Sequence, residues 1–174
     1  MLVGKMTRKN LLACLPAGGV AIEIGVAEGV FSSDILEMAK PSQLQLVDPW
    51  IHQSRPDYQL DANNVGDEAN EQRYRSVLKK FSAEIESGVV HVRRGFSKDV
   101  LPEFEDQTFD WAYVDAMHTR DAVREDLRLV WPKVKPDGLI LGHDFSNSPE
   151  ARARGFGVVD GVRDFIRSSG AHLV

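Results

Sequence analysis

Hydrophobic residues follow two different spacings along the chain, and their alternation predicts the fold. Short apolar runs rich in β-branched residues are typical of buried parallel strands. Such runs predict strands at residues 20–24, 44–47, 89–92, 109–114 and 139–141. Between them, apolar residues recur at helical intervals, which predicts helices near residues 8–15, 31–39, 74–86, 123–134 and 162–169.

This order of elements predicts the α/β class: a doubly wound, Rossmann-like, mostly parallel sheet with helices on both faces. A length of 174 residues fits a single domain over residues 1–174. Residues 51–69 show no periodicity and predict a lid or substrate loop. Ligands of such sheets bind beyond the carboxyl ends of the strands, so we expect site residues directly after each strand.

Charge and composition narrow the class of partner. The chain has 21 Lys and Arg residues against 26 Asp and Glu residues, and it has no stripe of basic residues. This argues against nucleic acid as the principal partner. No apolar stretch is long enough to predict a membrane span or a signal peptide. The single cysteine, Cys14, allows no internal disulfide, and its leucine neighbours predict burial. These features predict a cytoplasmic protein without a membrane partner.

The segment after the first predicted strand is rich in glycine. Gly25 allows a tight turn, and Gly29 lets the chain approach a ligand closely. The middle glycine of a dinucleotide fingerprint is missing, and Glu28 would repel a pyrophosphate. Asp48 ends the second strand, where a carboxylate can accept hydrogen bonds from ribose hydroxyls. Together these residues favour a ligand that carries adenosine and positive charge.

A second group of polar residues follows the fourth and fifth predicted strands. Asp115 and His118 come after residues 109–114, and His143 and Asp144 come after residues 139–141. Neighbouring strand ends bring all four together. Two carboxylates in one pocket repel each other unless a cation or a proton lies between them, and imidazole ligands favour ions such as Mn, Fe, Ni or Zn.

Five segments in order resemble the class I S-adenosylmethionine-dependent methyltransferases, across roughly residues 7–170. The likeness is to the small-molecule O-methyltransferase branch, which includes macrocin O-methyltransferase-like and cephalosporin-hydroxylase-like sequences. The segments that carry it are 21–29, 46–50, 94–97, 111–118 and, taken together, 131–133 with 142–145.

The resemblance implies methyl transfer from S-adenosylmethionine to a hydroxyl of a small-molecule acceptor. It places Asp48 at the ribose and Asp115 at the sulfonium. The remaining implied cofactor residues are Glu23, Gly25 and Gly29 near the methionyl portion, and Gly95, Phe96 and Ser97 beside the adenine.

Related O-methyltransferases often hold a divalent metal at the ends of these two strands. The resemblance therefore implies Mg or Mn on Asp115 and Asp144, and we expect His143, at a position where an oxygen ligand is common, to complete the metal site. We expect Asp115, His118 and His143 to be the catalytic residues, with one histidine taking the hydroxyl proton.

The sequence departs from the family at its C-terminal end. The family's sheet ends in an antiparallel hairpin, but only residues 171–174 follow the last predicted helix, so the hairpin is incomplete. We expect either that the chain is truncated or that a partner subunit covers the exposed sheet edge, since an unpaired edge invites association into a homo-oligomer. Three alternatives stay open: a non-heme-iron hydroxylase-like enzyme, a nicotinamide-dependent oxidoreductase, and a non-catalytic S-adenosylmethionine-binding module.

Overall fold

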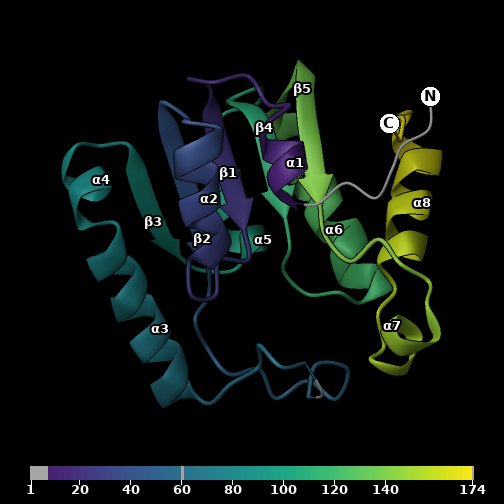
Figure 1. The fold of residues 1–174 in the computed structure, drawn as a ribbon. Helices are drawn as coiled ribbons and strands as arrows, with labels where there is room; N and C mark the ends of the chain where they lie inside the picture. The colour runs from purple at the N-terminus through teal and green to yellow at the C-terminus, as the bar shows by residue number, and fades with distance from the viewer. Residues whose placement is uncertain (1–7, 60, 174) are drawn as a thin grey trace.

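A computed structural model describes residues 8–59 and 61–173. Within these residues, five parallel strands form one sheet in the order β3-β2-β1-β4-β5 (Figure 1). The α/β, Rossmann-like prediction is therefore confirmed. The strands are β1 (Val20–Ile24), β2 (Gln43–Asp48), β3 (Val90–Arg94), β4 (Phe109–Val114) and β5 (Val134–Gly142).

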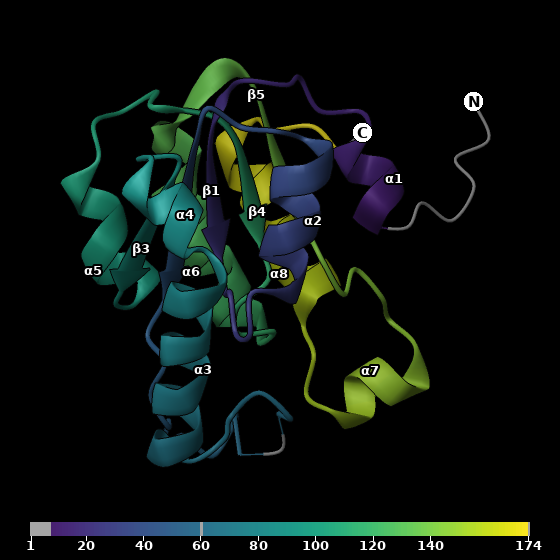
Figure 2. The same ribbon diagram turned by 60° about the vertical axis from the view of Figure 1, so that its left-hand side comes forward.

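Helices cover both faces of the sheet (Figures 1 and 2). Apolar residues of α1 to α4 pack on one face, and those of α5 and α6 pack on the other, with α8 against α6. The helices are α1 (Arg8–Leu12), α2 (Val30–Met38), α3 (Asp67–Lys80), α4 (Ser82–Glu86), α5 (Ser97–Val100), α6 (Arg120–Val130), α7 (Pro149–Ala153) and α8 (Val158–Ser169), with 3-10 turns at Leu101–Glu103 and Trp131–Lys133.

Strand β1 lies at the centre of the sheet because its side chains are buried on both faces. Ala21 belongs to the core on the α2 side, whereas Ile22 and Ile24 belong to the core on the α6 side. β1 pairs in parallel with both β2 and β4, so the order of strands reverses between β1 and β4. This reversal is the topological switch point at which doubly wound sheets bind ligands.

Three local expectations differ from the structure. The predicted helix 74–86 is interrupted at Phe81, whose backbone lies outside the α-helical region, so that α3 and α4 are separate. Helix α6 ends at Val130 because Pro132 lacks an N–H, and Val134 begins β5 instead of ending the helix. Cys14, predicted to be buried, is exposed.

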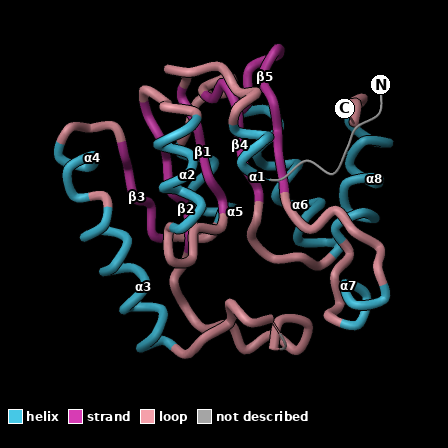
Figure 3. Tube along the Cα trace, in the orientation of Figure 1, coloured by secondary structure: helices cyan, strands magenta, loops and turns pink. Residues whose placement is uncertain are grey.

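A long loop between β2 and α3 passes beneath the carboxyl ends of the strands toward α7 (Figure 3). It ends where α3 begins at Asp67, three residues before the predicted end of the loop. Within the described ranges, no helix combines the length and the apolar character that crossing a membrane requires.

Candidate active site

A cavity of about 770 Å³ opens at the switch point. Residues that follow β1, β2, β3 and β4 line it, together with part of the long loop and one side of α6. The predicted site residues that line it are Glu23, Gly25, Asp48, Gly95, Phe96, Ser97 and Asp115. The structure thus brings the residues assigned to the cofactor to one cavity, with the exception of Gly29, which is not among the described lining residues.

Asp48 joins the loops that follow β1 and β2. Its Oδ2 accepts hydrogen bonds from the backbone N–H groups of Val26 and Ala27, at 2.9 and 3.0 Å. Its Oδ1 accepts a bond from the backbone N–H of Trp50 at 2.8 Å, and the Trp50 indole N–H donates to the Ala27 carbonyl. Ala27 and Trp50 both have positive φ, at 49° and 43°. Asp48 therefore holds two strained loops in place, a role additional to its predicted contact with ribose.

The two predicted glycines are needed for different reasons. Gly25 has φ 91°, and a Cβ there would lie 2.2 Å from the carbonyl oxygen of Asp115. At Gly29, a Cβ would lie 2.8 Å from the ring of Phe81. Gly29 thus allows α2 to pack closely against α3, whereas the sequence predicts that it allows close approach to a ligand.

Glu23 is the most deeply buried acidic group of the cavity wall, with 1% of its surface exposed. The Ser32 hydroxyl of α2 donates a hydrogen bond to its Oε2 at 2.5 Å. Burial raises the pKa of Glu23 to about 8, although the Ser32 hydrogen bond acts in the opposite direction. The carboxyl group is therefore largely neutral near pH 7 in the absence of a cationic ligand.

The predicted adenine segment contacts Asp126, which is not among the site residues predicted from the sequence. The Ser97 hydroxyl donates a short hydrogen bond to Oδ1 of Asp126 on α6. Asp126 lines the cavity and is 6% exposed, and burial raises its pKa to about 6. A signal was present, because Asp126 adjoins Leu127 on the apolar side of an amphipathic helix.

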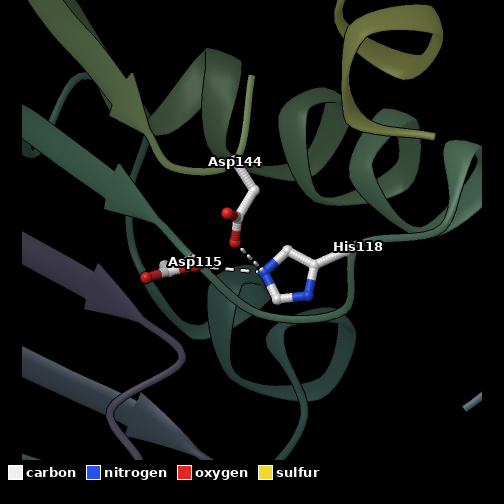
Figure 4. A group of neighbouring side chains, drawn as sticks. All are labelled: Asp115, His118 and Asp144. Atoms are coloured by element: carbon white, nitrogen blue, oxygen red, sulfur yellow. Dashed lines mark hydrogen bonds and ion pairs between the residues drawn. The ribbon is translucent and has the colours of Figure 1, made fainter. Parts of the chain in front are cut away.

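The predicted acid and imidazole group assembles after β4 and β5 (Figure 4). His118 Nε2 lies 3.2 Å from Asp115 Oδ1 and 3.1 Å from Asp144 Oδ2. The opposite ring nitrogen, Nδ1, lies 3.2 Å from Asp61 Oδ2, which the long loop supplies. The ring of Phe156 stacks on the imidazole at 4.4 Å. His118 is therefore surrounded by three carboxylates and one aromatic ring.

The charge of His118 is set by two opposing effects. Burial alone would lower its pKa, but hydrogen bonds to Asp115 and Asp61, with the charge of Asp144, raise the pKa to about 9. In this arrangement the imidazolium form separates carboxylates that would otherwise repel each other.

His143 lies at the edge of the same group. Its Nδ1 is 3.0 Å from Asp144 Oδ2 and 3.9 Å from Asp115 Oδ1. Arg8 of α1 donates a hydrogen bond to this nitrogen at 3.0 Å, and another Arg8 nitrogen lies 3.3 Å from Asp115 Oδ2. Arg8 and Asp61 carry no motif in the sequence, since they come from segments far from residues 115 and 143.

The donor set fits a divalent ion, although with a different histidine from the one predicted. In the described residues, one ligating atom each from Asp115, His118 and Asp144 lies within 4.8 Å of the other two. Carboxylates suit Mn²⁺ and imidazole suits Zn²⁺, so this mixed set fits either ion. His143 instead interacts with Arg8, so the predicted set of Asp115, His143 and Asp144 stays a prediction.

Comparison with known families identifies the class. Residues 22–145 match the family described as "Methyltransferase domain", which is more than half of the chain. The chain therefore belongs to the methyltransferase domain family. With its parallel sheet and switch-point cavity, it has the class I S-adenosylmethionine-dependent methyltransferase fold. No functionally curated protein matches the sequence.

Solved structures support the same fold. A protein from Corynebacterium glutamicum superposes with a TM-score of 0.60 at 15% identity, covering 96% of this chain and 72% of that one. Precorrin-6y C5,15-methyltransferase from Geobacter metallireducens GS-15 superposes with a TM-score of 0.58 at 14% identity, covering 90% of this chain and 68% of that one. Spermidine synthase from Thermotoga maritima superposes with a TM-score of 0.53 at 14% identity, covering 90% of this chain and 45% of that one. Differently named enzymes share the fold, so it does not define the acceptor.

Proposed function

We propose that the protein transfers a methyl group from S-adenosylmethionine to a hydroxyl of a small molecule. The observation that carries the proposal is one cavity that extends from Asp48 and Phe96 to Asp115, whose carboxylate contacts His118. A nucleoside at the first end would place its sulfonium near Asp115. The sulfonium already activates the methyl group, so the protein has to align donor and acceptor and to receive the hydroxyl proton.

The surroundings of the cavity favour a small polar acceptor. The long loop contributes His52, Gln53 and Tyr58 to the lining, and Asp61 to the histidine group. The sequence carries a net charge of −5, which argues against a nucleic-acid acceptor. In this proposal the loop covers the acceptor and His143 takes the proton, because a pKa of about 9 keeps the His118 imidazole protonated near pH 7 and a bound ion would occupy its Nε2.

A divalent cation, when bound, would be held by Asp115, Asp144 and His118 and would lower the pKa of an acceptor hydroxyl. The described group has one histidine and two carboxylates, whereas a facial iron triad of the oxygenase type has two histidines and one carboxylate. This composition supports methyl transfer over the iron hydroxylase alternative.

The direct test combines binding with turnover. Calorimetry should show binding of S-adenosylhomocysteine and no binding of NAD. Formation of S-adenosylhomocysteine from S-adenosylmethionine should then depend on an added acceptor from a panel of catechols, sugars and matched amines. Asp115→Asn should lose turnover, and Asp57→Asn in the exposed part of the loop should keep it. Turnover with amines alone would contradict hydroxyl transfer, and absence of S-adenosylhomocysteine binding would contradict the whole proposal.

The oligomeric state is a separate proposal. Among the described residues, β5 pairs with β4 alone, and Leu139 on β5 is 44% exposed. We expect a second copy to cover this edge, because unpaired strand edges favour association. Sedimentation equilibrium of the wild type beside Leu139→Lys tests this, and a wild-type monomer at micromolar concentration would contradict it.

A further inference from the structure

Arg8 places a positive charge at the acidic end of the cofactor cavity. It lies on α1, and its guanidinium is 3.3 Å from Asp115 and 5.4 Å from the centre of the Phe31 ring. Its side chain is 38% exposed and lines the cavity together with Glu23 and Gly25. The Arg8–Asp115 pair therefore presents one cation and one anion side by side to the same space.

The methionyl part of S-adenosylmethionine has the opposite pattern of charges. It is an α-amino acid, so an ammonium and a carboxylate are attached to one carbon. The ammonium can bind the Asp115 carboxylate, but the ligand's own carboxylate would be repelled by Asp115. A partly enclosed carboxylate requires a cation or several N–H donors to offset its lost hydration.

The other cations that line the described part of the cavity are engaged elsewhere. Arg55 forms two hydrogen bonds with Asp57, at 3.0 and 2.8 Å. Arg73 lies 3.4 Å from Glu28 and donates to the Asn63 carbonyl. Lys98 lies over the Phe96 ring, in the segment assigned to adenine. Among these cations, Arg8 is the one that contacts Asp115.

We propose that Arg8 binds the α-carboxylate of the cofactor and selects the intact amino acid over its decarboxylated form. The ligand's ammonium replaces Arg8 beside Asp115, while the ligand's carboxylate receives the guanidinium. The free protein's ion pair is thus exchanged for two ion pairs with the ligand. This inference rests on the proposed cofactor function and adds the residue that reads the carboxylate.

The experiment compares two ligands that differ only in the carboxylate. These are S-adenosylhomocysteine and its decarboxylated analogue, 5′-deoxy-5′-(3-aminopropylthio)adenosine, measured by calorimetry on the wild type, Arg8→Gln, Arg8→Lys and Arg75→Gln. Arg75 is a matched control because it pairs with Glu71 on α3 and is not among the described lining residues. Thermal unfolding of each variant confirms that it is folded.

We expect the wild type to bind S-adenosylhomocysteine about tenfold or more tightly than the analogue, as a charge-assisted pair provides. Arg8→Gln should remove this preference by weakening S-adenosylhomocysteine alone, Arg8→Lys should keep part of it, and Arg75→Gln should keep all of it. Equal wild-type affinity for the two ligands overturns the inference, and so does an equal loss for both ligands in Arg8→Gln. The comparison of the two ligands on the wild type tests the inference even if Arg8→Gln does not fold. Wild-type protein that binds neither ligand overturns the proposed function itself.

Discussion

A Cβ atom on Gly25 would lie 2.2 Å from the carbonyl oxygen of Asp115, so the end of β1 and the end of β4 are in backbone contact. This contact joins the loop that follows β1, at the cofactor cavity, to the group of Asp115, His118 and Asp144 that follows β4 and β5. It also shows that the glycine is required by the fold itself, before any ligand binds.

Gly25→Ala should therefore destabilise the protein through two effects. The φ of 91° strains any side chain, and the added Cβ clashes with backbone that cannot move alone. We expect a loss of about 2–5 kcal/mol in the free energy of unfolding, measured by denaturant titration. Gly88→Ala is the matched control, since Gly88 has φ 77° and nothing within 4 Å of its Cβ position. Equal losses in the two variants would contradict the clash.

Asp48→Ala should weaken S-adenosylhomocysteine binding by about 1.5–3 kcal/mol, the range for a hydrogen bond to a charged group. The variant should also unfold at a lower temperature, because Val26, Ala27 and Trp50 lose their shared acceptor. The ribose role is isolated with the 2′,3′-dideoxy analogue, which the wild type and the variant should bind equally well. If the variant binds this analogue more weakly than the wild type does, Asp48 acts through the loops instead.

Glu23 should make the stability of the free protein depend on pH. Its pKa is raised from 4.5 to about 8 in the folded state, so between these values the native protein holds a proton that the unfolded chain has released. Raising the pH through this window therefore favours unfolding, by at most about 1.4 kcal/mol per pH unit. Glu23→Gln keeps an acceptor for Ser32 and should reduce the slope from pH 5 to 8, leaving the part that the raised pKa values of Asp126 and His118 produce. Glu105→Gln, at an exposed site, should leave the slope unchanged. A slope as steep in Glu23→Gln as in the wild type would exclude Glu23 as a source of the pH dependence.

Metal binding should depend on His118 more than on His143, because His118 completes the group of ligating atoms. Titration with Mn²⁺, followed by elemental analysis, should show binding to the wild type and to His143→Ala. Binding should be lost in Asp144→Asn and in His118→Ala. Chelation should stop transfer to a hydroxyl and leave S-adenosylhomocysteine binding largely intact, since Asp48 is not part of the group and Asp115 alone is shared with the cofactor site. Full activity of metal-free protein would contradict a role for the ion in transfer.

The sequence alone was sufficient for the order of the strands along the chain and for the end of the sheet that carries the site. Hydrophobic periodicity is a local property, and the carboxyl ends of parallel strands always share one edge of the sheet. For this reason the sequence alone predicts Asp48, Asp115 and Asp144 as residues of the site. The sequence does not predict the helix break at Phe81. The Phe81 ring packs against Gly29, and this contact joins residues far apart in the sequence.

What only the tertiary structure decided is which side chains meet at that edge. Asp61 reaches His118 across 57 positions of sequence, and Arg8 reaches His143 across 135. No local pattern encodes such contacts, since they depend on where a loop and an N-terminal helix pack against the finished sheet. Tertiary packing also decides which of His118 and His143 lies between the two carboxylates. Both histidines follow strands, but only the three-dimensional packing places the ring of His118 between Asp115 and Asp144 and leaves His143 beside Arg8.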